Sequence, residues 1–114
     1  MEHREYPKLV RDNIPDIIKE KEGFEPTYRV LEDDTEFLAA LLKNITEEAA
    51  EVQESVENEN TEEELADLQE LIDATVRHLG KTRKDIEKIQ KEKREKRGGF
   101  EKRILMDEPL KPQS

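Results

Sequence analysis

Residues 36–79 read EFLAALLKNITEEAAEVQESVENENTEEELADLQELIDATVRHL, and this stretch decides the fold of the chain. Apolar side chains recur in both halves at steps of three and four, the pattern of amphipathic helices. Asp33, Asp34 and Thr35 offer N-cap oxygens for a first helix over about residues 36–57. Thr61 and Glu64 form a capping-box pair that opens a second helix, and Gly80 suits its C-terminal cap. The short break at residues 58–60 predicts that the two helices are antiparallel.

The flanking segments predict shorter elements. Pro15 suits the first turn of a helix that runs to about Glu22. Residues 27–31 are β-branched and aromatic after Pro26, so we expect a short strand there. A last helix starts after Thr82 and runs to about Arg97, where Gly98 and Gly99 close it. Residues 104–106 add a strand or an extended tail, and about 107–114 form a frayed tail. The prediction is one all-α domain over residues 1–114, a small antiparallel helical bundle with at most a short two-stranded element.

Composition limits the class of protein further. The chain has 114 residues, of which 32% are hydrophobic and 44% charged. A chain this short buries only about 65% of the surface that its unfolded form exposes, so we expect an oligomer, a bound metal, or both. The chain has no cysteine, which excludes disulfides and thiolate metal sites. No apolar run of membrane-spanning length and no signal peptide are present, so a cytoplasmic protein without membrane contact is expected.

The charge is segregated along the chain. The formal net charge is −10. Residues 36–77 hold thirteen acidic and two basic side chains, whereas residues 81–103 hold eleven basic and five acidic ones. The acidic surface argues against binding a nucleic acid polymer. An acidic helical pair followed by a basic arm suits a site for a metal and a phosphate ligand.

Four carboxylates fall close to the faces that pack. At about 100° per residue, Glu48 lies at the edge of the first apolar arc and Glu51 one turn further on the same side. Glu64 lies within the second arc and Asp67 just outside it. Buried carboxylates are costly and repel each other, and a divalent cation removes both costs. Carboxylate ligands suit Mg²⁺ or Mn²⁺. The alternative is that these side chains are solvated, and that Glu64 serves only as a capping residue.

The two acidic clusters also form a motif. Residues 47–51 (EEAAE), twelve further residues, and then residues 64–67 (ELAD) read EExxE…ExxD. This pattern resembles the all-α nucleoside triphosphate pyrophosphohydrolases of the MazG type, which are related to phosphoribosyl-ATP pyrophosphohydrolase. Residues 8–15 (KLVRDNIP) and 93–100 (KREKRGGF) are similar to a small MazG-like subgroup. The similarity covers roughly residues 6–106, and the short gap between the motif halves leaves no room for the inserts of longer relatives.

The resemblance implies Mg²⁺-dependent cleavage of a nucleoside triphosphate to the monophosphate and pyrophosphate. It also implies a homodimer or homotetramer with the helical pair at the interface. The implied metal ligands are Glu48, Glu51, Glu64 and Asp67. Glu47 or Glu51 would accept the proton of the attacking water. We expect phosphate contacts, by charge, from Arg97 first, and from Lys93, Arg94, Lys102, Arg103, Lys8 and Arg11; solvated helix faces are the alternative for each of them.

Two other functions are compatible with these residues. Phosphoribosyl-ATP hydrolysis in histidine biosynthesis would use the same carboxylates as a pyrophosphohydrolase that maintains the nucleotide pool. A non-catalytic acidic helical module that binds a basic partner is the rival from another class. Geometry separates the module from the enzymes, because a module has no reason to turn Glu48 and Glu64 inward.

Overall fold

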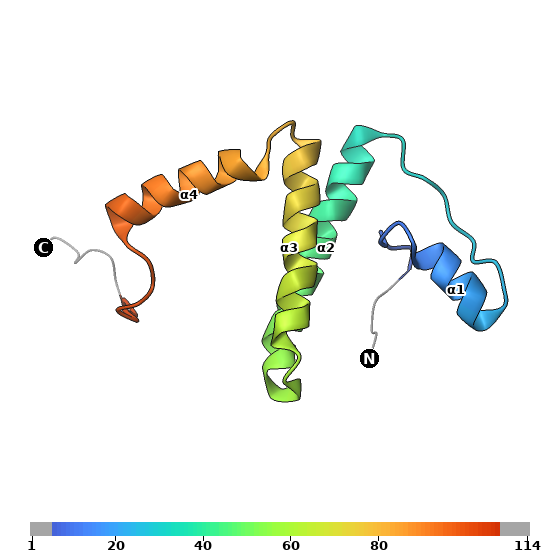
Figure 1. Ribbon diagram of the computed structural model, residues 1–114, viewed down its shortest axis with the longest axis horizontal. Helices are drawn as coiled ribbons and strands as arrows, with labels where there is room; N and C mark the ends of the chain where they lie inside the picture. Colours follow the sequence, from blue (N-terminus) through green and yellow to red (C-terminus); the bar gives the residue numbers. More distant parts are fainter. Residues whose placement is uncertain (1–5, 108–114) are drawn as a thin grey trace, which may run out of the picture. The chain divides into compact units, whose positions relative to one another are not determined.

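A computed structural model describes residues 6–107, and within that range every element of regular structure is a helix (Figure 1). The all-α prediction is therefore confirmed. The elements are α1 (Ile14–Glu22), α2 (Asp34–Ser55), the short 3₁₀ helix η1 (Val56–Asn58), α3 (Thr61–His78) and α4 (Arg83–Arg97). The chain divides into two compact units, one ending at Thr82 and one starting at Arg83. The predicted tail lies outside the described residues from position 108 onward.

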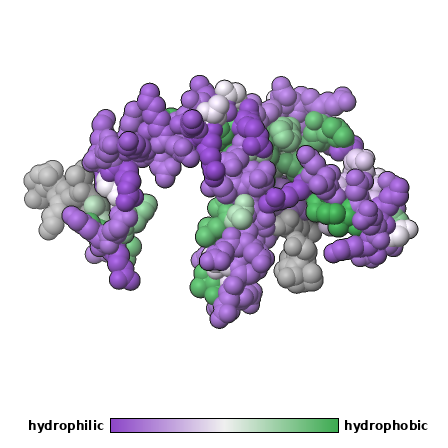
Figure 2. Space-filling model, in the orientation of Figure 1, coloured by the Kyte–Doolittle hydropathy of each residue, from purple (hydrophilic) through white to green (hydrophobic). Residues whose placement is uncertain are grey.

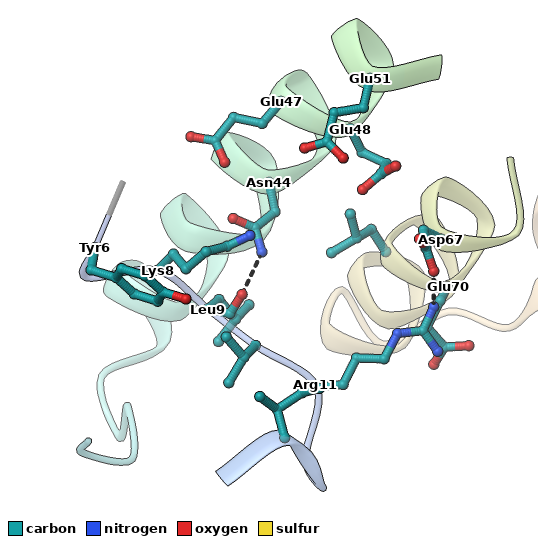
Figure 3. Close-up of a pocket in the computed structure, with 13 residues that line it drawn as sticks. Tyr6, Lys8, Leu9, Arg11, Asn44, Glu47, Glu48, Glu51, Asp67 and Glu70 are labelled. Atoms are coloured by element: carbon teal, nitrogen blue, oxygen red, sulfur yellow. Dashed lines mark hydrogen bonds and ion pairs between the residues drawn. The ribbon is translucent and has the colours of Figure 1, made fainter. Parts of the chain in front are cut away.

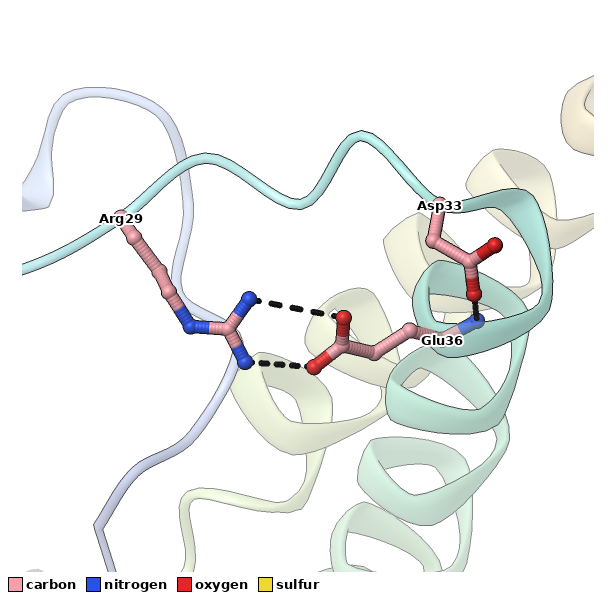
Figure 4. Close-up of polar contacts among 3 residues, drawn as sticks. All are labelled: Arg29, Asp33 and Glu36. Carbon is pink, nitrogen blue, oxygen red and sulfur yellow. Dashed lines mark hydrogen bonds and ion pairs between the residues drawn. The ribbon is translucent and has the colours of Figure 1, made fainter.

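The first unit is built around an antiparallel hairpin of α2 and α3 (Figure 1). The predicted cap at the start of α2 is confirmed, because Asp33 Oδ2 accepts a hydrogen bond of 2.9 Å from the backbone N–H of Glu36. The two terminal guanidinium nitrogens of Arg29, Nη1 and Nη2, donate to the two carboxylate oxygens of Glu36 (Figure 4). This hydrogen bonding lowers the pKa of Glu36. The extended segment before α2 is thus fixed to the first turn of the helix.

The turn between α2 and α3 differs from the prediction. Thr61 is the first residue of α3 rather than its cap, and the N-cap position belongs to Asn60, which makes no capping hydrogen bond with its side chain. The buried Ser55 hydroxyl instead contacts Thr61 Oγ1 at 3.2 Å. Asn60 Nδ2 donates to Glu64 Oε2 at 3.4 Å. The capping-box interpretation is wrong, and the Glu64 carboxylate is left to other partners.

The hairpin packs through one side of the apolar arc of α2. The buried residues of this helix are Leu41, Asn44, Glu48 and Ser55. Leu41 and Val76 are the only buried hydrophobic residues in the described part of the chain. Leu42 of α2 is 48% exposed, and Val56, in η1 just after the helix, is 66% exposed. The hairpin therefore uses a largely polar stripe as its inner face.

A second apolar stripe runs along the outside of α3. Leu65, Ile72 and Leu79 follow one another at steps of seven and are 49%, 36% and 58% exposed. Figure 2 shows hydrophobic patches within a mostly hydrophilic surface. Together with Leu42 and Val56, these residues make up what we call the outer apolar stripe. Apolar positions repeated every seven residues are the pattern of helices that pack against further helices.

The strand expected at residues 27–31 is absent, and residues 104–106, where we expected a strand or an extended tail, form no strand either. Residues 27–31 and 104–106 are extended, but no strand forms anywhere in residues 6–107. A strand needs a partner for its backbone groups, and neither segment has one. Tyr28 and Leu105 are accordingly 62% and 93% exposed. The prediction of a strand at residues 27–31 was therefore wrong, whereas the all-α class was predicted with at most such an element.

Both long helices after the turn end as the glycines predict. Gly80 has φ +79°, its N–H donates to Arg77 O, and the N–H of Lys81 donates to Val76 O. These two hydrogen bonds make a Schellman motif. In the second unit, α4 buries no residue, and Gly98 follows it with φ +83°. No helix in the described part of the chain has both the length and the apolar character that a membrane crossing requires.

Candidate metal and phosphate site

Three of the predicted carboxylates converge between α2 and α3. Glu48, Glu51 and Glu64 each offer one carboxylate oxygen, and these oxygens all lie within 4.8 Å of one another. Glu48 and Glu51 share a side of α2 because they are three positions apart. Glu64 lies in the first turn of α3, which the antiparallel hairpin brings beside the second half of α2. We call these three residues the carboxylate cluster.

The cluster is sheltered from water. Glu48 is only 3% exposed, and Glu51 and Glu64 are half-buried. Burial raises the pKa of Glu48 to about 8, aided by hydrogen bonding with the Glu64 side chain and by the charges of Glu51, Glu64 and Asp67. Glu64 Oε1 is buried and accepts no hydrogen bond from the described residues. A proton or a cation at the cluster would relieve this repulsion.

Asp67, the fourth predicted metal ligand, has a different partner. Its Oδ1 accepts a hydrogen bond of 2.6 Å from Arg11 Nη2. Asp67 is not a member of the cluster, although its charge contributes to the raised pKa of Glu48. Arg11 therefore neutralises part of the negative charge at the edge of the cluster.

A pocket of about 410 Å³ opens beside the cluster, between the N-terminal segment and the two helices (Figure 3). Carboxylates line one side of it, and two basic residues, Lys8 and Arg11, reach it from the N-terminal segment. The charged residues of its lining are Lys8, Arg11, Glu47, Glu48, Glu51, Asp67 and Glu70. The pocket thus combines ligands for a cation with donors for an anion.

The basic arm belongs to the second unit. Arg97, Lys93, Lys102 and Arg103 are exposed there. Arg94 Nη2 is paired with Glu101 Oε2 at 3.0 Å. A phosphate contact by any of these five residues stays a prediction, whereas Lys8 and Arg11 lie at the pocket itself.

Asn44 is a site residue that the sequence analysis missed. It is 9% exposed, and its Nδ2 donates a hydrogen bond of 2.8 Å to the backbone oxygen of Leu9. The side chain also lines the pocket. A sequence signal exists, because Asn44 is a polar residue on the packing side of α2, one turn before Glu48.

The carboxylate cluster could hold a metal cation. Its donors are all carboxylate oxygens, the ligands that hard cations prefer. The pKa of Glu48 is raised first by burial and then by its interactions with neighbouring carboxylates, and a bound cation would favour the charged form of this group. Comparison of the chain with family models, curated proteins and solved structures finds no significant match, so the family resemblance of the motif stays a prediction.

Proposed function

We propose that this protein is a Mg²⁺-dependent nucleoside triphosphate pyrophosphohydrolase that releases the monophosphate and pyrophosphate and so maintains the nucleotide pool. The observation that carries the proposal is the convergence of Glu48, Glu51 and Glu64 within 4.8 Å beside a pocket that also has basic residues. The EExxE…ExxD motif, which contains all three residues, supports the same reaction.

The carboxylate cluster and the basic residues of the pocket have separate roles in this proposal. Glu48, Glu51 and Glu64 would hold the cation, with Asp67 beside them. A bound Mg²⁺ neutralises phosphate oxygens and makes a coordinated water more acidic. Lys8 and Arg11 would bind the phosphates, and the planar guanidinium of Arg11 suits two phosphate oxygens at once.

Glu47 is the group we assign as proton acceptor. It lines the pocket but does not belong to the carboxylate cluster, whereas Glu51, the other candidate, does. A carboxylate outside the ligand set keeps its basicity for the attacking water. The assignment leaves Glu51 to the cation.

The burial of Glu48 favours an enzyme over an acidic interaction module. A module that binds a basic partner needs exposed carboxylates, and Glu48 is only 3% exposed. Phosphoribosyl-ATP hydrolysis would use the same carboxylates, so the choice of substrate separates the two enzymatic hypotheses.

Self-association is part of the proposal. The outer apolar stripe leaves Leu42, Val56, Leu65 and Leu79 between 48% and 66% exposed. A second copy that packs its own stripe here would give a four-helix arrangement and enlarge a core that has only two buried hydrophobic residues among those described.

Product analysis with a nucleotide panel tests the function. The full chain is incubated with Mg²⁺ and ribonucleoside triphosphates, deoxyribonucleoside triphosphates or phosphoribosyl-ATP, and the products are separated. Monophosphate with pyrophosphate is the expected outcome, and diphosphate with phosphate would mean that another bond is cut. Glu48→Gln should abolish turnover, while Glu54→Gln, an exposed residue of the same helix, should not. Absence of turnover on the whole panel would refute the proposal.

A further inference from the structure

Two side-chain hydrogen bonds join the N-terminal segment before α1 to the hairpin. Asn44 Nδ2 donates to Leu9 O at 2.8 Å, and Arg11 Nη2 donates to Asp67 Oδ1 at 2.6 Å. Figure 3 shows the segment passing the two helices, with Lys8 and Arg11 on either side of Leu9. The two contacts bridge the segment to both helices of the hairpin.

The two contacts differ in how exposed their side chains are to solvent. Arg11 and Asp67 have side chains that are 57% and 42% exposed, and such surface ion pairs contribute little to stability. Asn44 is 9% exposed, and breaking a buried hydrogen bond leaves a polar group unsatisfied, which costs more. Asn44 is therefore the firmer of the two anchors.

The amide at position 44 has no evident role within its own helix. Asparagine is a poor helix former, and its neighbours on the buried stripe, Leu41 and Glu48, lie one turn to either side. An apolar side chain would serve the packing equally well. The hydrogen bond from the Asn44 amide to Leu9 O explains why an amide is present here, because Leu9 belongs to the segment that carries Lys8 and Arg11.

The location of Asn44 connects this anchor to the site. The pocket of about 410 Å³ and a second one of about 540 Å³ both include Leu9, Arg11 and Asn44 in their lining. The segment and its anchor therefore stand where the two pockets meet. A shift of the segment would move both basic residues away from the carboxylate cluster together.

We propose that Asn44 is a positioning residue: it seats residues 8–11 beside the carboxylate cluster so that Lys8 and Arg11 meet the phosphate groups of the substrate. The inference rests on the proposed function for the identity of that substrate. It concerns the chain's own contacts, however, and it requires only a polyphosphate as ligand.

Inorganic tripolyphosphate with Mg²⁺ is the probe, and calorimetry on the full chain gives its dissociation constant. Asn44→Leu keeps a side chain branched at Cγ but removes the donor, and it should weaken binding about tenfold. Asn44→Gln keeps an amide donor and should bind more tightly than Asn44→Leu. Lys43→Ala, an exposed neighbour on the same helix, should bind as the unsubstituted protein does. Asn44→Ala also removes the donor but lacks the bulk of leucine, so it tests whether the weaker binding of Asn44→Leu comes from the lost donor.

Hydrogen exchange gives a second readout that does not depend on any ligand. The amides of residues 8–11 should exchange about ten times faster in Asn44→Leu, while those of α2 and α3 keep their protection. A purely structural role would instead loosen the hairpin itself. Uniform loss of protection, or unchanged exchange in residues 8–11, would overturn the proposal.

A double-mutant cycle decides whether Asn44 acts through the segment. In the Lys8→Ala/Arg11→Ala background, Asn44→Leu should weaken tripolyphosphate binding no further. A full additional tenfold loss, or no binding by the unsubstituted protein, would overturn the proposal. Failure of the proposed function looks different: tripolyphosphate binding would still depend on Asn44, but no nucleotide in the panel would be cleaved.

Discussion

Arg11 Nη2 donates a hydrogen bond of 2.6 Å to Asp67 Oδ1, across 56 positions of sequence. The contact brings a positive charge to the edge of an otherwise acidic site. It also occupies an oxygen of the residue that the motif assigns to the metal. The charge balance of the site is therefore set by the N-terminal segment as well as by the hairpin.

Removal of Arg11 should tighten the binding of the cation alone. Arg11→Ala leaves the negative charge of Asp67 uncompensated, so we expect Mg²⁺ to bind about two- to fivefold more tightly, within the modest range of an exposed ion pair. Calorimetric titration with Mg²⁺ in the absence of nucleotide measures this. Arg29→Ala, which breaks the ion pair with Glu36, is the matched control. Weaker Mg²⁺ binding in Arg11→Ala would contradict the charge argument.

Stability without a divalent cation should fall as the pH rises. Folded Glu48 has a pKa of about 8 against an ordinary value of 4.5. Between these values the folded state binds more protons than the unfolded state, so the free energy of unfolding decreases by at most about 1.4 kcal/mol per pH unit. Urea denaturation in EDTA from pH 5 to 8.5 measures the slope. Glu48→Gln should flatten it and Glu54→Gln should not, and a slope that survives in Glu48→Gln would assign it elsewhere.

Magnesium should raise the melting temperature through the carboxylate cluster. A ligand that binds only the folded state adds about 2.7 kcal/mol at one hundred times its dissociation constant. We expect Glu51→Gln and Glu64→Gln to lose most of this shift in thermal denaturation. Glu63→Gln, exposed on the same turn of α3 as Glu64, should keep it. An equal shift in all the variants would rule out the cluster as the binding site.

Glu47 should separate proton transfer from metal binding. Glu47→Gln removes a base while leaving Glu48, Glu51 and Glu64 intact, so we expect kcat to fall about 100-fold. The melting shift with Mg²⁺ should be preserved. Steady-state kinetics and thermal denaturation on the same preparation test both statements, and a lost Mg²⁺ shift would make Glu47 a ligand instead.

A charge in the outer apolar stripe should dissociate the oligomer. Leu65→Glu places a carboxylate on a side chain that is 49% exposed in the single chain and that we expect to be buried between copies. Sedimentation velocity should then show the mass of one chain instead of a multiple. Val30→Glu, at a position 75% exposed and away from the stripe, should leave the mass unchanged. Identical masses for Leu65→Glu and the unsubstituted chain would place the interface elsewhere.

Local chemistry made much of the fold predictable. The ends of the helices follow from residues that act on their immediate neighbours: Asp33 as N-cap, and Gly23, Gly80 and Gly98 with positive φ. The strand at residues 27–31 failed because a strand depends on a distant partner, which composition does not reveal. The capping box at Thr61 failed because Asn60 takes the N-cap position.

The site was predictable only in the features that helical periodicity controls. Helical periodicity indicated that Glu48 and Glu51 lie on the same side of their helix and that Glu64 points inward. The structure brings the carboxylates of these three residues together. Periodicity alone could not predict which half of the apolar arc of α2 faces α3. Nor could it find the contacts of Arg11 with Asp67 or of Asn44 with Leu9, because these join residues 56 and 35 positions apart.

The polar inner face of the hairpin has a consequence for engineering. Asn44, Glu48 and Ser55 occupy three of the four buried positions of α2. Burial raises the pKa of Glu48, so an apolar side chain at this position would remove the cost of burying a carboxylate, and a laboratory selection for heat resistance would find its first gain there. Under the proposed function, the same substitution would remove a metal ligand and with it the activity.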